Sequence, residues 1–202
     1  MNHYFELAQS ITFVDRNNKK EIISNDRSLE FIGKGRSAIV YKIRGTNKVL
    51  KVFYPQFSHI AKEEGEIYQE LQNISYFPTL YEIGENYIVI DYIQGNTLFE
   101  CLLQGIQINS DIIGEVDGAL NLAKQRGLNP SDIHLRNLIL TSENRIQVID
   151  VARFRQTKDC TQWRDLKKSF YTFYQKPFFP KRIPERILNF IATLYKKKII
   201  RL

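Results

Sequence analysis

The chain has 202 residues and a net charge of +7, with 43% hydrophobic and 25% charged residues, which is typical of a folded globular protein and excludes a disordered one. No apolar run approaches the roughly 18 residues of a membrane-spanning helix, and the first 20 residues lack the basic and apolar blocks of a signal peptide. Cys101 and Cys160 show no metal-ligand spacing and suggest no disulfide framework, so we expect a reducing cytoplasm.

The first half of the chain is predicted to be rich in strands. β-Forming residues alternate or cluster in seven segments: 11–14, 21–24, 28–33, 38–44, 48–53, 80–84 and 86–93. Before the sixth segment, apolar residues recur at helical spacing (Ile60, Ile67, Leu71 and Ile74), and Ser58 is the candidate N-cap of this amphipathic helix.

After Gln94 the character of the sequence changes. Helical periodicity is found in 97–104 and 109–126, two short strands are expected at 137–140 and 145–149, and the region from Cys160 onward is again helical with a proline-rich break. The sequence therefore predicts an α+β fold of two lobes, a β-rich lobe with one helix (1–93) and a mainly helical lobe (94–202).

A glycine-containing turn is predicted between two strands, in FIGKGRSAIVYK. Gly33 and Gly35, followed by the small Ala38 and then Val40, would let backbone amides approach phosphate oxygens without a Cβ in the way. A strand rather than a helix follows, which excludes a Rossmann fingerprint, and no Gly-Lys-Ser/Thr closes the turn, which excludes a Walker loop. By itself the segment is a weak signal, because ordinary turns often have this composition.

A lysine lies in an apolar strand, where its charge is costly to bury. Lys51 in VLKVF either points outward to solvent or is neutralised by an acid of the following helix. Glu64 shares the inward face of that helix with Ile67 and Leu71, so it is the candidate partner. A lysine held in this way would position its charge for a nucleotide phosphate.

Three polar residues lie beside the apolar strand-like runs of the second half: Asp132, Asn137 and Asp150. Asp and Asn are common turn residues, which is the simplest explanation. Alternatively, Asn137 and Asp150 are two oxygen ligands of one metal ion and Asp132 is a base.

Taken in order, these residues resemble the motifs of the eukaryotic-type (Hanks-like) protein kinase superfamily. The matching motifs are Gly33-x-Gly35-x-x-Ala38-x-Val40, Lys51, Glu64, the hinge-like IDYIQGNTL, Asp132-x-x-x-x-Asn137 and Asp150-Val-Ala. Each motif is weak alone, whereas six in this order are specific. The resemblance implies a bilobal kinase-like fold that binds ATP and Mg²⁺ and transfers a phosphoryl group to a hydroxyl.

The resemblance also implies a role for each matching position. The residues implied to bind the nucleotide are Gly33, Gly35, Ala38, Val40, Lys51 with Glu64, and the backbone groups of Asp91 and Ile93 after the gatekeeper Ile90. The catalytic residues are Asp132, which accepts the proton of the substrate hydroxyl, and Lys51 and Arg136, which supply positive charge. Asn137 and Asp150 would hold Mg²⁺, which prefers such oxygen ligands.

The sequence departs from the family pattern in four places. Pro130-Ser131 replaces the His-Arg before the catalytic Asp, so switching through an activation-loop phosphate is not expected. His134 stands where Ser/Thr kinases carry a lysine, and Val151-Ala152 replaces the Phe-Gly after the metal-binding Asp. About 50 residues follow Asp150, without an Ala-Pro-Glu element.

This short second lobe resembles those of RIO-type and other small atypical kinases, and of bacterial kinases that phosphorylate lipopolysaccharide sugars. The compact pattern suggests a bacterial origin. Asp165 either braces the catalytic loop or is an ordinary i,i+3 partner of Lys168.

The sequence thus predicts a small serine/threonine-protein kinase that acts on a protein or on itself. The alternatives are a kinase of a sugar or other small hydroxyl compound, and a pseudokinase that binds nucleotide without transferring phosphate. From residue 175 onward there are eight Lys or Arg and one acid, Glu185, so this tail alone carries +7. The tail either binds an acidic partner or is the solvated face of a terminal helix. Nucleic acid is not expected as the primary target, since no zinc spacing or aromatic ribonucleoprotein motif is present.

Overall fold

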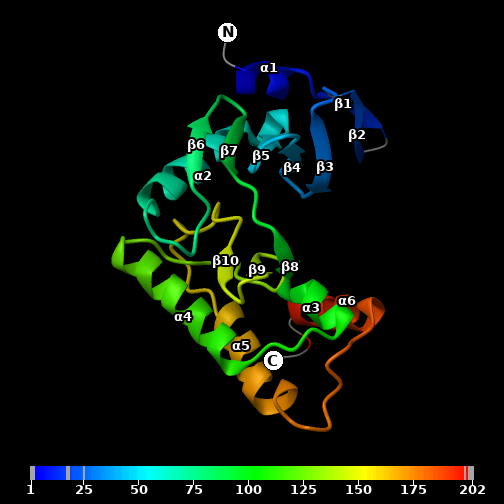
Figure 1. Cartoon of the computed structure of the whole chain (residues 1–202), viewed down its shortest axis with the longest axis vertical. Coiled ribbons are helices and arrows are strands. Elements are labelled where there is room, and N and C mark those ends of the chain that lie inside the picture. Colours follow the sequence, from blue (N-terminus) through cyan, green and yellow to red (C-terminus); the bar gives the residue numbers. More distant parts are fainter. Residues whose placement is uncertain (1–2, 17–18, 25, 198, 200–202) are drawn as a thin grey trace. The chain divides into compact units, whose positions relative to one another are not determined.

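The structure is a computed structural model that describes residues 3–16, 19–24, 26–197 and 199. The chain divides into two compact units, unit 1 with residues 1–73 and 78–93 and unit 2 with residues 74–77 and 94–202. Figure 1 shows strands concentrated in the first and helices in the second. The prediction of an α+β fold with a β-rich and a mainly helical part is confirmed.

Unit 1 is built on a five-stranded antiparallel sheet. Its strand order is β3 (Leu29–Lys34), β4 (Ala38–Ile43), β5 (Lys48–Phe53), β7 (Tyr87–Asp91) and β6 (Leu80–Ile83). The register places Lys51 of β5 between Val40 of β4 and Ile88 of β7. A separate hairpin is formed by β1 (Thr12–Arg16) and β2 (Lys19–Ser24).

Helix α2 (Ser58–Glu70) packs closely against the sheet. A Cβ on its Gly65 would lie 2.6 Å from Ile83 Cγ1 of β6, so only glycine permits this approach. The prediction that Ser58 is the N-cap is wrong. The chain already turns in the 3₁₀-helix η1 (Pro55–Phe57), so Ser58 is itself helical and Phe57 occupies the cap position without a side-chain hydrogen bond.

A second helix of unit 1, α1 (His3–Gln9), was not predicted from the sequence. Its Leu7 and Ala8, with Ile11 after it, join a buried cluster that includes Ile39 and Leu50 of the sheet. Figure 1 shows α1 beside the strands. Seven residues are too few for helical periodicity to be recognised, and a helix of this length depends on packing rather than on intrinsic propensity.

Unit 2 contains a three-stranded antiparallel sheet in the order β10 (Ile146–Val148), β9 (Leu138–Thr141), β8 (Gly95–Thr97), of which β8 was not predicted. Its helices are α3 (Leu98–Gln104), α4 (Ser110–Gln125), α5 (Gln162–Ser169), the π-helix η2 (Phe170–Tyr174) and α6 (Glu185–Lys196). Thr97 and Glu100 form a capping box that begins α3. Within the described ranges, no helix has the length and apolarity that crossing a membrane requires.

Candidate active site

The predicted site residues fall into two groups, one in each unit. The glycine-containing turn, Lys51, Glu64, Asp91 and Ile93 belong to unit 1, whereas Asp132, Arg136, Asn137 and Asp150 belong to unit 2. Each group is described by itself.

The glycine-containing turn joins β3 to β4 and is closed by a hydrogen bond from Gly35 N to Ala38 O of 2.8 Å. Ala38 is buried, and Gly33 lies opposite Val40 next to a bulge in β3. Neither glycine has a positive φ. A Cβ on Gly33 would meet nothing within 4 Å, and one on Gly35 would make only an ordinary contact of 3.8 Å. The fold therefore does not require glycine here, and the backbone is open to a ligand.

Lys51 and Glu64 form a buried ion pair that joins β5 to α2. The Lys51 Nζ lies 2.8 Å from Oε1 and 2.7 Å from Oε2 of Glu64. The Glu64 side chain is fully buried and that of Lys51 is 11% exposed. Inward-facing Ile67 and Tyr68 hold this face of α2 against the sheet. The structure thus brings together the two residues that the sequence analysis paired.

The end of β7 is fixed by contacts of Asp91 with Tyr81 of β6 and with Thr79, the residue that precedes β6. Its backbone N–H donates to Thr79 O at 3.1 Å, and its carboxylate accepts from Thr79 N at 2.8 Å and from the Tyr81 hydroxyl at 2.7 Å. The latter bond raises the pKa of Tyr81. Of the Asp91 backbone groups, the carbonyl is the one suited to the predicted adenine contact, together with Ile93, the last residue of this unit.

In unit 2 the segment from Asn129 to Asn137 forms the predicted catalytic loop. Asn129 N donates to Phe154 O at 2.6 Å, which ties the loop to the segment after Asp150. At the other end, Asn137 N donates to His134 O at 2.9 Å, and its side-chain Nδ2 donates to Asp132 O at 3.2 Å. Ser131, in place of the family's Arg, is buried.

Asp132 and Asp150, the two acids of the predicted site, share a rare backbone conformation. Asp132 has φ 62° and Asp150 has φ 61°, in the left-handed region that few residues other than glycine adopt. Such conformations cost about 1–3 kcal/mol each and are concentrated at functional sites. Ile149 N donates to Asn137 O at 2.9 Å, so the residue preceding Asp150 lies against Asn137.

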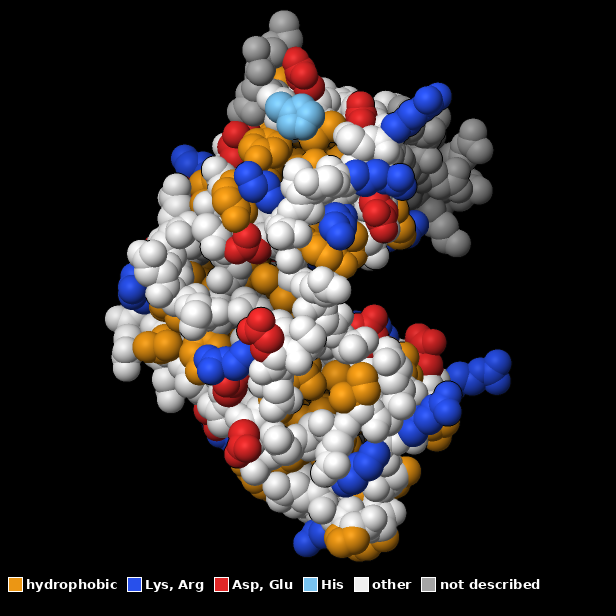
Figure 2. All heavy atoms as spheres, in the orientation of Figure 1, with side chains coloured by type: hydrophobic (Ala, Val, Ile, Leu, Met, Phe, Trp, Pro, Cys, Tyr) orange, Lys and Arg blue, Asp and Glu red, His pale blue; other side chains and the backbone are white. Residues whose placement is uncertain are grey.

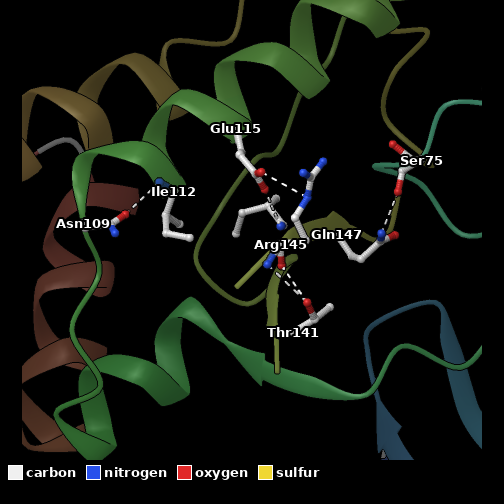
Figure 3. A network of polar contacts seen from close by, with 8 residues as sticks. Ser75, Asn109, Ile112, Glu115, Thr141, Arg145 and Gln147 are labelled. Carbon is white, nitrogen blue, oxygen red and sulfur yellow. Dashed lines mark hydrogen bonds and ion pairs between the residues drawn. The ribbon is translucent and has the colours of Figure 1, made fainter. Parts of the chain in front are cut away.

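The β9–β10 hairpin, which lies between Asn137 and Asp150 in the chain, is anchored to α4 by Glu115 (Figure 3). Its carboxylate accepts from Ile146 N at 2.8 Å and pairs with Arg145 Nε at 3.1 Å. On the other side, Gln147 Nε2 donates to Ser75 O at 2.6 Å. These bonds hold the hairpin in a defined position, and with it the segments that carry the predicted metal ligands.

An arginine that the sequence analysis missed contacts the predicted base. Arg153 Nε lies 3.3 Å from Asp132 Oδ2, and both side chains are about two fifths exposed, at 40% and 43%. A turn begins at Val151 and is closed by a hydrogen bond of 2.9 Å from Phe154 N to Val151 O. This turn places Arg153 beside Asp132. The Asp150-x-x-Arg153 spacing is the only sequence signal that could have indicated it.

Arg136 and His134 lie on the same loop in different surroundings. The Arg136 guanidinium lies 3.4 Å from the centre of the Phe99 ring of α3, and its Nη2 donates to Asn189 Oδ1 of α6 at 3.1 Å. Burial lowers the pKa of His134, while the nearby charges of Asp132 and Asp150 act in the opposite direction. His134 is therefore close to both acids, whereas Arg136 is engaged with α3 and α6.

Asp165 is bonded to residues of two helical segments. It accepts from the Thr161 and Tyr195 hydroxyls, both at 2.7 Å, and the bond from Tyr195 is the main cause of its lowered pKa. The acid therefore links α5 to α6. Lys168, the expected i,i+3 neighbour, lowers the pKa of Asp165 less than the Tyr195 and Thr161 hydroxyls do.

The available oxygen atoms fit a magnesium ion. Among the described residues there is no cluster of three or more His, Cys, Asp or Glu side chains, as a zinc or dedicated calcium cage would need. Mg²⁺ is instead usually held by one or two protein oxygens and the phosphates of a nucleotide. Because Nδ2 of Asn137 donates to Asp132 O, its Oδ1 is the atom that the predicted ligand role would use, and the Asp150 side chain is exposed.

Comparison with known proteins identifies two relatives, and no family model matches the chain. The chain is 46% identical over 193 residues to "Putative serine/threonine-protein kinase YrzF" of Bacillus subtilis, covering 95% of this chain and 90% of that protein. It is 28% identical over 159 residues to a "Probable serine/threonine-protein kinase" of Clostridium acetobutylicum, covering 69% of this chain and 24% of that protein.

Proposed function

Because the chain belongs to a kinase family, the one that includes its Bacillus subtilis relative, we propose that it is a small serine/threonine-protein kinase that uses ATP and Mg²⁺. We place it, within this proposal, among the Hanks-like kinases with a reduced, RIO-like second lobe. The observation that carries the proposal is the buried Lys51–Glu64 pair. Apolar residues of similar volume would often be as stable there, so a positioned ammonium group for a phosphate is the better explanation.

In unit 1 the proposed task is to bind the nucleotide. The open backbone at Gly33 and Gly35 would let amide groups approach the phosphates, and Lys51 would pair with them. The Asp91 carbonyl and the Ile93 backbone would hydrogen-bond the adenine. Ala38 and Val40 would contact the base and ribose from the strand that follows the turn.

In unit 2 the proposed task is the transfer itself. Asp132 takes the proton of the substrate hydroxyl, whose oxygen forms a bond to the γ-phosphorus as the bond from that phosphorus to the β–γ bridging oxygen breaks. Arg153 holds the Asp132 carboxylate, and Arg136 adds positive charge to the loop. Asn137 and Asp150 would hold Mg²⁺, which when bound neutralises charge on the phosphate oxygens.

The test is transfer of labelled γ-phosphate from ATP with Mg²⁺, followed by identification of the labelled amino acid. Wild type is compared with the variants Asp132→Asn and Lys51→Met. Asparagine is chosen at position 132 because it tolerates the positive φ of that residue. Lys124→Met on the exposed face of α4 is the matched control. We expect labelled serine or threonine in the wild type and the control and none in the two site variants.

The other outcomes contradict this proposal in different ways. Phosphate released from ATP without labelled protein would indicate a small hydroxyl compound as substrate. ATP binding without any turnover would indicate a pseudokinase.

A further inference from the structure

Helix α6 is bonded to the catalytic loop of the same unit. Asn189 Oδ1 accepts from Arg136 Nη2 at 3.1 Å. Ile183 N, just before α6, donates to Leu102 O of α3 at 2.8 Å, and Figure 1 shows α6 beside α3. Whatever binds to the exposed side of α6 is therefore bound to an element that contacts the loop containing Arg136.

The free side of α6 is apolar and basic. At 100° per residue, Arg186, Phe190 and Lys197 lie on one face of the helix with Ile187 at its margin, whereas Leu188 lies on the opposite, buried face. Phe190 is 63% exposed and Ile187 is 49% exposed. Two large apolar side chains adjoining on one helix face mark an interaction surface more strongly than scattered single ones.

The C-terminal segment has a large excess of positive charge. From residue 175 to the end of the chain there are eight Lys or Arg residues and one acidic residue, Glu185. Among the described residues of this segment, the exposed basic ones are Lys176, Arg182, Arg186, Lys196 and Lys197. Figure 2 shows Lys and Arg side chains (blue), apolar ones (orange) and also Asp and Glu side chains (red) over the part of unit 2 where Figure 1 labels α3 and α6. Such a surface is complementary to an acidic segment with apolar residues and repels a second copy of itself.

We infer that the exposed face of α6, formed by Arg186, Ile187, Phe190 and Lys197, is the docking surface for a protein substrate that carries an acidic segment with apolar residues. This inference rests on the proposed function. The bond from Arg136 to Asn189 favours a protein substrate over a lipid surface, because a segment docked on α6 lies against an element that contacts the catalytic loop.

The test uses the full chain and two protein substrates, acidic dephosphorylated casein and basic histone. The variant Arg186→Glu/Phe190→Ser is compared with Lys124→Glu/Leu122→Ser, which makes the same kinds of change on the exposed face of α4. We expect the KM for casein to rise about tenfold in the α6 variant only. The kcat and the KM for ATP should change by less than about twofold, since neither residue touches the reacting groups.

Binding of casein without ATP, measured with the Asp132→Asn chain, separates this inference from the proposed function. If the wild type phosphorylates no protein, the proposed function fails, while loss of casein binding in the α6 variant still supports the surface. Casein binding that is equal in the α6 variant and its control overturns the inference. The inference is also overturned if the α6 variant keeps its casein binding but, unlike the control, no longer binds phosphatidylserine vesicles, which would assign the face to a lipid surface. It is likewise overturned if the α6 variant keeps its casein binding but alone loses self-association, which would assign the face to a second copy.

Discussion

At the scale of single residues, the buried ion pair of Lys51 and Glu64 is weak evidence for stability, whereas the proposed function gives it a clear role. Removing both charges from water costs several kcal/mol, which the short contacts of 2.7 and 2.8 Å offset. Removing only one partner leaves a buried charge without its main counterion. The pair therefore allows stability and activity to be separated by experiment.

We expect Lys51→Met to lower the free energy of unfolding by about 3–5 kcal/mol, because the fully buried Glu64 carboxylate loses its cation. The double variant Lys51→Met/Glu64→Met should regain most of that stability and still transfer no phosphate. Urea unfolding and label transfer measure the two properties. If the stability losses of the two single variants simply add in the double variant, Lys51 and Glu64 are not energetically coupled.

A second residue-scale prediction concerns Gly35. Because a Cβ there meets only a contact of 3.8 Å, Gly35→Ala should leave stability unchanged or raise it by about 0.4–1 kcal/mol. The KM for ATP should nevertheless rise, since the added methyl lies where the phosphates approach. Gly114→Ala in α4, where a Cβ also has open space, is the control. An unchanged KM in both variants would contradict a nucleotide at this turn.

Some site residues were identifiable from the sequence and others were not. Glu64 was identifiable as the partner of Lys51 because helical spacing gives the inward face of α2. Arg153 was not, because its contact with Asp132 depends on the path of a turn far along the chain. The engagement of Arg136 with Phe99 and Asn189 also depends on tertiary packing. The roles of all these residues in catalysis remain predictions.

At the scale of elements, one acid of α4 anchors the β9–β10 hairpin. Glu115→Ala should lower the free energy of unfolding by about 1–3 kcal/mol. The reason is that the backbone N–H of Ile146, a buried residue, loses its hydrogen-bond acceptor. Arg145→Ala should cost less than about 1 kcal/mol, since the Arg145 side chain is half exposed to solvent. Chemical denaturation of both variants gives the comparison. Equal losses would mean that the ion pair, rather than the backbone bond, anchors the hairpin.

The link between α5 and α6 should depend on pH. The bonds from Tyr195 and Thr161 lower the pKa of Asp165 below its usual 3.8 in the folded state. Their contribution is therefore complete above that value and is lost as the pH falls through the lower, folded pKa. Tyr195→Phe should be less stable than wild type by about 1 kcal/mol at pH 7, and the difference should shrink below pH 3.8. A difference independent of pH would exclude the carboxylate as the cause.

The strands and long helices were predicted correctly because their patterns are local. Strands β3, β4, β5 and β7 have clustered β-forming residues, and α4 has apolar residues at helical spacing. Strand β8 is only three residues long and exists through its pairing with β9. Such an element has no local sequence pattern from which it could be predicted. The start of α2 was also not predictable locally, because the preceding 3₁₀-helix η1 already turns the chain and Ser58 is therefore not the cap.

At the scale of the whole molecule, ligand binding and folding are linked. A ligand at a hundred times its Kd adds about 2.7 kcal/mol to the free energy of unfolding. We expect ATP with Mg²⁺ to stabilise the wild type more than ATP with a chelator does. Asp150→Asn and Asn137→Ala should lose the Mg²⁺-dependent part. Thermal unfolding at fixed ATP concentration measures it, and equal stabilisation in all variants would contradict the assigned metal ligands.

The helix before the kinase-like motifs changes where this protein can be shortened. The motifs begin near Phe31, so a trimmed version would naturally start there. Such a version would lack Leu7, Ala8 and Ile11, and the apolar side chains of Ile39 and Leu50 that they cover would face water. It would also lose the bond of 2.7 Å from Lys48 Nζ to the Tyr4 hydroxyl. The smallest version that folds is therefore longer at its beginning than the motifs suggest, and aggregation of a shorter one would say nothing about catalysis.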